Sequence, residues 1–180
     1  SGMYRIKLPI ESGTGRVLRD LMKKPHTVKK AREIALNCKE LNLETIGLFV
    51  VGMPGETKSE LLETVQFARD IELDYTIFGI ATPISGSPLE KEVLEKGLAD
   101  KESIRSKYPR NDVFFETEEL GAEDLLRVRW LEWADLNFST AAKVSRIARM
   151  FGNSDDEVTE MAISARRNFR NRFLESPAAD

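Results

Sequence analysis

The chain has 180 residues, of which 41% are hydrophobic and 32% are charged. These values are normal for a folded globular protein and exclude disorder as its general state. Lys and Arg total 27 and Asp and Glu total 30, so the net charge is −3, which speaks against a general attraction to nucleic acid or anionic lipid. No apolar run approaches the roughly 20 residues that a membrane helix needs, and no signal peptide opens the chain. We therefore expect a cytoplasmic protein without a membrane partner.

The single cysteine and the single histidine limit the metal chemistry of the chain. One cysteine, Cys38, excludes an internal disulfide and any iron–sulfur or zinc site that takes several thiolates from this chain. Because Cys38 lies on the apolar stripe of a predicted helix, we expect a buried, inert thiol. His26 stands in a predicted loop without a partner ligand, and we expect it to face solvent or to cap a neighbouring element.

Strand and helix signals alternate from the start of the chain. Residues 4–10 (YRIKLPI) alternate in polarity, which predicts a half-covered strand. A short helix over residues 16–24 and a longer helix from Thr27 follow, the latter with apolar residues on one face. Residues 46–51 (IGLFVV) form a continuous apolar run, which is typical of a strand covered on both faces of a parallel sheet.

The same alternation continues to about residue 97. Thr57 and Glu60 have the spacing of a capping box, which predicts the start of the next amphipathic helix. Residues 75–81 (YTIFGIA) predict a third strand, and Pro88 suits the first turn of a helix over residues 89–96. Three strand–helix units in a row predict an α/β fold with parallel strands and right-handed connections.

The pattern changes after the third unit. Residues 101–117 are charged and irregular, and the rest of the chain is helical in character, with Ser154 as the expected cap of the last helix. We expect three parts: the α/β part over residues 3–98, a linker over residues 99–121, and an all-helical region over residues 122–176.

Three loops follow the predicted strands, and active groups in parallel sheets lie at such strand ends. They are ESG at residues 11–13, GMPGE at residues 52–56 and TPISGS at residues 82–87. Glu11 can accept hydrogen bonds from hydroxyl or ammonium groups of a ligand, or it can lie there because a helix N-terminus favours a carboxylate. Gly52 lets a ligand ring approach the backbone, whereas a plain turn before a helix cap explains the same residues.

Taken together, the loops carry a family resemblance. Three segments resemble, in their order and spacing, the second half of a radical SAM domain: IESGTGRVLRDLMKKPHT, FVVGMPGETKSELLETVQFARD and TPISGSPLEKEVLEKG. The resemblance covers about residues 6–97. It is closest to the branch with an upstream cobalamin-binding domain, such as the anaerobic magnesium-protoporphyrin IX monomethyl ester oxidative cyclases. It implies a partial parallel (β/α) barrel that uses S-adenosylmethionine and a [4Fe–4S] cluster, with cobalamin in that branch.

The resemblance also implies which residues contact S-adenosylmethionine. Seven positions match: Glu11, Ser12, Lys23, Val51, Gly52, Thr82 and Pro83. The position of Glu11 carries a polar side chain that contacts the cofactor, and that of Lys23 carries a cation for the methionyl carboxylate. The positions in the second and third loops lie near the adenine. Leu48 stands where some members place an acid, so we expect no ribose contact from that strand.

The resemblance also points to residues that the chain lacks. Its members hold the cluster with three cysteines in a CxxxCxxC loop, and their barrel has six βα units rather than three. We therefore expect part of a longer enzyme, whose partners are the missing N-terminal half and a small-molecule substrate. Alone, the chain is expected to bind no cofactor and to be inactive. The uncovered edge of the strand at residues 4–10 predicts a homodimer through that edge.

Two other functions stay open. A tRNA methylthiotransferase has similar loops, but such enzymes usually carry a small basic β-barrel domain, whereas the tail here is helical and of mixed charge. A non-catalytic α/β binding or scaffold module is the second alternative. A CxxxCxxC loop in the same gene would exclude the scaffold.

Two groups of residues in the helical tail suggest binding. Trp130 and Trp133 could stack on a flat substrate such as a tetrapyrrole, but they share a stripe with Leu126, which favours core packing. Four arginines could bind phosphate or RNA, but acidic residues surround them, which favours a solvated helix face and speaks against nucleic acid. The arginines are Arg166, Arg167, Arg170 and Arg172, and the acids are Asp155, Asp156, Glu157, Glu160 and Glu175.

Overall fold

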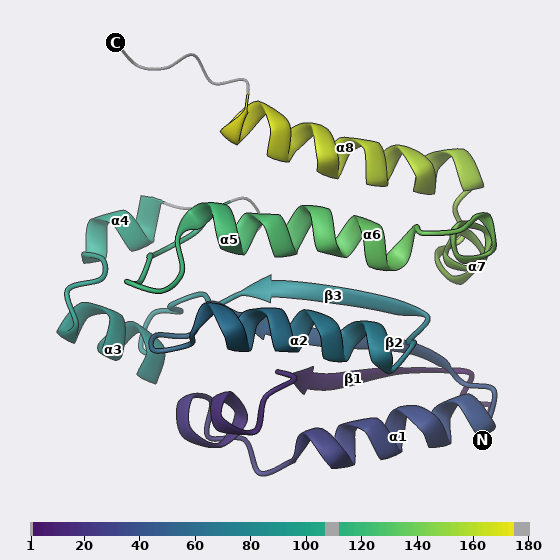
Figure 1. Cartoon of the computed structure of the whole chain (residues 1–180), viewed down its shortest axis with the longest axis horizontal. Helices are drawn as coiled ribbons and strands as arrows, with labels where there is room; N and C mark the ends of the chain where they lie inside the picture. Colours follow the sequence, from purple (N-terminus) through teal and green to yellow (C-terminus); the bar gives the residue numbers. More distant parts are fainter. Residues whose placement is uncertain (1, 107–111, 175–180) are drawn as a thin grey trace.

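Three parallel strands form a sheet in which neighbours in the sheet are also neighbours in the chain (Figure 1). The computed structural model describes residues 2–106 and 112–174. The strands are β1 (Arg5–Glu11), β2 (Glu44–Val51) and β3 (Tyr75–Ile80). Both strand pairs are parallel, so the predicted α/β class is confirmed.

Helices connect the strands in the predicted order. They are η1 (Val17–Leu21) and α1 (Val28–Glu40) before β2, α2 (Lys58–Asp70) before β3, and α3 (Pro88–Glu95) after it. A threonine or serine hydroxyl accepts a backbone hydrogen bond at the N-terminus of α1, α2 and α3. These caps satisfy N–H groups that the first helical turn leaves unpaired, so each βα turn leads directly into its helix.

Two expectations for the connecting segments need correction. The helix predicted over residues 16–24 is a five-residue π-helix, because Lys23 adopts a left-handed conformation (φ 54°) through which a helix does not continue. The segment predicted to be irregular contains a short helix, α4 (Lys101–Ser106), whose start is capped by the Asp100 carboxylate. Residues 107–111 of that segment lie outside the described residues.

The main core lies between the sheet and the helices α1 and α2. Leu8, Phe49 and Phe78 contribute one side chain from each strand, and the apolar faces of α1 and α2 pack against them. Cys38 belongs to this core and is buried, which confirms the prediction for its thiol.

The outer edge of β3 is covered by a continuous helical segment, which Figure 1 shows running alongside it. The segment consists of α5 (Ala122–Leu126), η2 (Arg127–Glu132) and α6 (Trp133–Asn137). The side-chain amide of Asn137 makes the two hydrogen bonds that a neighbouring strand would make. It accepts from the Thr76 N–H at 2.8 Å and donates to the Thr76 carbonyl at 2.9 Å. These bonds satisfy backbone groups that an edge strand would otherwise leave open.

Two more helices complete the described chain: α7 (Ala141–Phe151) and α8 (Asp155–Phe173). Gly152 ends α7 in a left-handed conformation (φ 72°), and Ser154 caps α8, as predicted. Helix α8 packs on η2 and α6, at the side of that segment away from the sheet (Figure 1). Trp130 and Trp133 of that segment are half-buried against the core clusters, in agreement with core packing. Within the described residues, no helix is both long and apolar enough to cross a membrane.

Candidate functional site

The three loops that follow the strands lie side by side and are connected to one another. The guanidinium of Arg16, at the start of η1 just after the first loop, donates to the Gly55 carbonyl at 2.7 Å in the second loop. The Ala81 N–H, where β3 ends, donates to the Val51 carbonyl at 2.8 Å, where β2 ends. The structure therefore brings together the three segments that the sequence singles out.

In the first loop, Glu11 ends β1 with a left-handed backbone (φ 69°). Its carboxylate lies 2.7 Å from the ammonium of Lys24, and the two side chains are 15% and 39% exposed. Lys23, the predicted cofactor contact, is exposed beside this pair rather than part of it. Glu11 thus presents a carboxylate that is oriented by a cation yet reachable from solvent.

Ser12 has a different environment from Glu11. It is fully buried, and its hydroxyl accepts from the Thr14 N–H at 3.1 Å and pairs with the Thr64 hydroxyl at 3.1 Å. Thr64 belongs to α2, so these bonds attach the first loop to that helix. The Nε2–H of His26 donates a hydrogen bond to the Ile10 carbonyl (3.0 Å), which agrees with a capping role for this histidine.

In the second loop, Gly52 adopts a positive φ of 84° that glycine tolerates best. A Cβ at this position would lie 2.9 Å from Cδ2 of Leu125 in α5, so the space beside Gly52 is already filled by the protein. The Val51 side chain is also fully buried. A ligand at this strand end can therefore reach the half-buried side chains of Val50 and Met53 rather than Val51 or Gly52.

Glu56 is the functional candidate that sequence reasoning missed. The residue is fully buried, and its Oε2 accepts from the Gly52 N–H at 2.6 Å and the Met53 N–H at 3.0 Å. Its Oε1 is buried and has no hydrogen-bond partner among the described residues. Burial raises the pKa of Glu56 to about 7, although the two N–H donors act in the opposite direction. The sequence does contain a signal for this residue: Glu56 follows Gly52 by four positions, in a turn between a buried strand and a capped helix.

In the third loop, the Thr82 hydroxyl donates to the Ile80 carbonyl at 3.0 Å and so continues the end of β3. Pro83 is buried next to it. The loop then leads to α3, whose cap Ser87 accepts from the Glu90 N–H at 3.1 Å.

The face of the sheet opposite α1 and α2 is only partly covered. Lys7 is exposed, Leu48 and Val50 are half-buried, and Ile77 is 37% exposed. An apolar sheet face with this much exposure, next to three connected loops, has the room and the character of a ligand or partner surface.

The described residues hold no group of three or more His, Cys, Asp or Glu side chains that could bind a metal ion. Cys38 is buried in the main core, on the other side of the sheet from the open face. The described part of the chain therefore does not contain the thiolates that an iron–sulfur cluster requires.

Comparison with known proteins finds a family match for the first part of this arrangement. Residues 1–68 match the Radical SAM superfamily. The matched segment contains the first two loops, with Glu11, Ser12, Lys23, Val51 and Gly52. Thr82 and Pro83 lie beyond it.

The chain is also similar in sequence to parts of three larger proteins. The chain is 32% identical over 108 residues to cytidylyl-2-hydroxyethylphosphonate methyltransferase of Streptomyces wedmorensis, over 57% of this chain and 20% of that protein. It is 31% identical over 97 residues to an uncharacterised methyltransferase of Pyrococcus horikoshii, over 54% of this chain and 21% of the relative. It is 32% identical over 85 residues to tRNA-2-methylthio-N6-dimethylallyladenosine synthase of Vibrio cholerae, over 46% of this chain and 18% of the relative. The chain thus spans about a fifth of the length of these curated relatives.

Proposed function

We propose that residues 3–98 form the S-adenosylmethionine-contacting part of a radical SAM (β/α) barrel, in a protein that holds its [4Fe–4S] cluster in a CxxxCxxC loop outside this chain. The observation that carries the proposal is the radical SAM match at residues 1–68, which includes two of the three connected loops. When bound, the cluster and S-adenosylmethionine supply a 5′-deoxyadenosyl radical that abstracts hydrogen from a small-molecule substrate. A single buried cysteine is consistent with cluster ligands elsewhere.

The proposed roles follow from the side chains that a ligand can reach. Glu11, oriented by Lys24, accepts hydrogen bonds from the ammonium or hydroxyl groups of S-adenosylmethionine. Lys23 is exposed beside it and attracts the methionyl carboxylate. The adenine lies near the ends of β2 and β3, where the half-buried side chains of Met53 and Thr82 are available. Ser12, Val51 and Pro83 are buried and act by shaping the loops.

The reaction catalysed by the whole protein is a finer proposal. The loops resemble most closely the branch with a cobalamin-binding domain, which includes the magnesium-protoporphyrin ester cyclases, and we propose that branch first. The similarity to tRNA-2-methylthio-N6-dimethylallyladenosine synthase of Vibrio cholerae favours a tRNA methylthiotransferase as the second candidate. A non-catalytic binding or scaffold module is the third.

The open edge of β1 is proposed to pair with the N-terminal half of the same protein. Among the described residues β1 pairs with β2 alone, and a groove of about 190 Å³ between β1 and α1 is lined by Pro9, His26 and Ile34. In the isolated chain, the same edge is available to a second copy as a homodimer. Sedimentation that shows only monomer at high concentration would contradict the homodimer.

The experiment that tests the cofactor site uses the complete gene product, reconstituted anaerobically with iron and sulfide. We expect Glu11→Gln and Lys23→Met each to raise the KM for S-adenosylmethionine by about tenfold, as the loss of one charge-assisted hydrogen bond implies. Lys29→Met, which removes an exposed lysine from α1, is the matched control and should leave KM unchanged. Equal effects of all three variants would contradict the assignment.

A further inference from the structure

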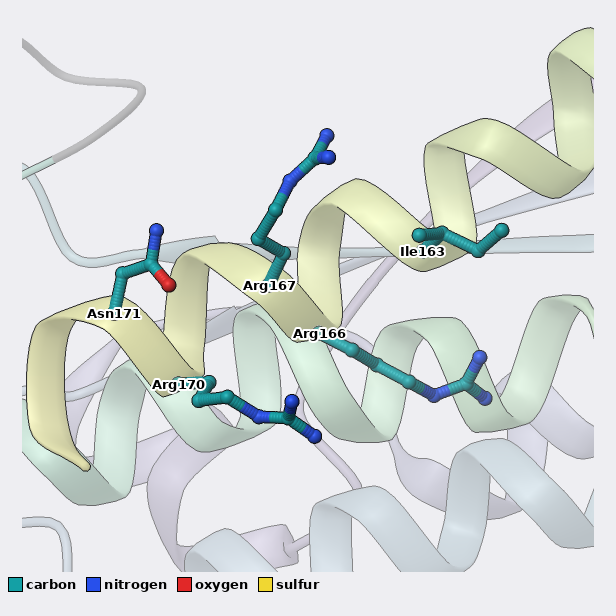
Figure 2. Close-up of a pocket in the computed structure, with 5 residues that line it drawn as sticks. All are labelled: Ile163, Arg166, Arg167, Arg170 and Asn171. Atoms are coloured by element: carbon teal, nitrogen blue, oxygen red, sulfur yellow. The ribbon is translucent and has the colours of Figure 1, made fainter. Parts of the chain in front are cut away.

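The outer face of α8 concentrates positive charge in a protein whose net charge is −3. Five of its residues recur at positions i, i+3, i+4, i+7 and i+8 and therefore share one face of the helix. They line a shallow depression of about 400 Å³, which Figure 2 shows: Ile163, Arg166, Arg167, Arg170 and Asn171. No acidic residue occurs between residues 161 and 174. The basic face is thus continuous over the C-terminal half of α8.

Three of the acids that suggested a neutral, solvated surface are remote from Arg166. Asp155, Asp156 and Glu157 lie in the first turn of α8, roughly 14 Å or more along the helix from Arg166, at 1.5 Å per residue. The Glu157 carboxylate accepts a hydrogen bond there from the N–H of Ser154 and so helps to cap the helix N-terminus. Glu175 lies outside the described residues.

Arg166 and Arg167 each form an ion pair with an acid, and both pairs are at the surface. Arg166 lies 2.7 Å from Asp135 of α6, and Arg167 lies 3.2 Å from Glu160. All four side chains are 50% to 59% exposed. Ion pairs as exposed as these contribute little, so a stronger anion can displace them.

The face continues onto η2 with one more cation and an aromatic ring. The guanidinium of Arg127 lies 5.1 Å from the centre of the Phe169 ring and extends the row of arginines beyond α8. It also lies 3.1 Å from the Glu123 carboxylate, in an ion pair as exposed as the two on α8. A second depression, of about 370 Å³, is lined by Trp130, Asn168, Asn171 and Arg172. The half-buried indole offers part of its ring for stacking, and the amides can donate to and accept from base edges.

We propose that this surface, the basic face of α8 together with Trp130, binds single-stranded RNA. Arginine suits phosphate because its planar guanidinium makes two parallel hydrogen bonds, and arginines one turn apart can follow a backbone of phosphates. An aromatic ring and amides beside the phosphate contacts are the groups that bind unpaired bases. An anionic membrane is disfavoured, because the apolar side of α8, including Val158 and Phe169, is already buried against the protein. The proposal does not depend on the S-adenosylmethionine site.

The test measures binding of a fluorescent 20-nucleotide single-stranded RNA to the 180-residue chain by anisotropy, over a range of salt concentrations. We expect Arg166→Gln/Arg170→Gln to weaken binding at least tenfold at low salt. The slope of log affinity against log salt should fall by about 1.4, since each lost phosphate contact on a single strand removes about 0.7. Lys29→Gln/Lys30→Gln removes the same charge from exposed positions of α1 and should change affinity less than twofold.

A second variant separates base contacts from phosphate contacts. Asn168→Ala removes an exposed amide and should weaken binding without changing the salt slope. Equal weakening by the two double variants would overturn the proposal, as would the absence of RNA binding by the wild-type chain. Sedimentation of the chain with phosphatidylserine vesicles, abolished by Arg166→Gln/Arg170→Gln while RNA does not bind, would reassign the face to a membrane.

Discussion

The carboxylate of Glu56 accepts a hydrogen bond from the Gly52 N–H at 2.6 Å, across the turn that joins β2 to α2. The same oxygen accepts from the Met53 N–H, so one side chain fixes the backbone of the loop that follows β2. The other oxygen is buried without a partner among the described residues. A loop in a proposed cofactor site is thus held by a carboxyl group that burial makes costly to ionise.

This relationship predicts a dependence of stability on pH. The folded protein holds the Glu56 proton to about pH 7, whereas the unfolded chain loses it near the ordinary pKa of 4.5. Between these values the folded state binds more protons, so the free energy of unfolding falls as the pH rises, by at most about 3 kcal/mol. Glu56→Gln keeps an oxygen for both N–H donors and should flatten this dependence between pH 5 and 7. Urea unfolding at several pH values measures it, and an unchanged slope would contradict the assignment.

Gly52 and Leu125 should be energetically coupled. Gly52→Ala places a Cβ 2.9 Å from Leu125 and forces a non-glycine residue to a φ of 84°, so we expect a loss of roughly 1–3 kcal/mol in the free energy of unfolding. Leu125→Ala removes the clash but not the backbone strain. In a double-mutant cycle, the loss of free energy of unfolding in the double variant should therefore be smaller than the sum of the losses in the two single variants. Strict additivity would refute the contact.

Substitutions of Asn137 and Thr76, which meet at the edge of β3, should affect stability differently. Asn137→Ala leaves the N–H and the carbonyl of Thr76 unpaired and buried, which should cost about 3 kcal/mol. The Thr76 hydroxyl has no partner among the described residues, so Thr76→Val should be neutral or slightly stabilising. Denaturant midpoints measure both variants, and a destabilised Thr76→Val would show that the hydroxyl is paired.

Thr57 should contribute to stability through its cap of α2. Its hydroxyl accepts from the Glu60 N–H, and the Glu60 carboxylate accepts from the Thr57 N–H at 3.0 Å. Thr57→Ala should lower the free energy of unfolding by about 1 kcal/mol, whereas Thr57→Ser keeps the hydroxyl and should lose far less.

The Arg16 guanidinium beside Glu60 lowers the pKa of that carboxyl to about 2. The stabilisation from Glu60 is therefore present above its ordinary pKa of 4.5 and is lost as the pH falls toward 2.

Local signals in the sequence predict the elements of the α/β part. The run IGLFVV becomes β2, and the Thr57–Glu60 spacing becomes a capping box, because both patterns depend on residues close together in the chain. The three strand-end loops are adjacent, as parallel pairing requires. The helix α4 was missed because its six residues are mostly charged and give little apolar periodicity.

The environment of the site residues could not be predicted in the same way. The space beside Gly52 is filled by Leu125, which is 73 residues further along the chain, and no local pattern encodes that contact. The burial of Ser12 depends in the same way on Thr64 of α2. The ion pair of Glu11 goes to Lys24 rather than Lys23, because the left-handed turn at Lys23 changes which side chain points back toward β1.

The most direct test of the proposed function is the formation of 5′-deoxyadenosine from S-adenosylmethionine. The 180-residue chain and the complete gene product are each reconstituted anaerobically with iron and sulfide, reduced, and assayed side by side. The account predicts a [4Fe–4S] cluster and 5′-deoxyadenosine in the complete gene product, and neither in the 180-residue chain. A complete gene product that forms no 5′-deoxyadenosine, or a stoichiometric cluster on the chain alone, would contradict it.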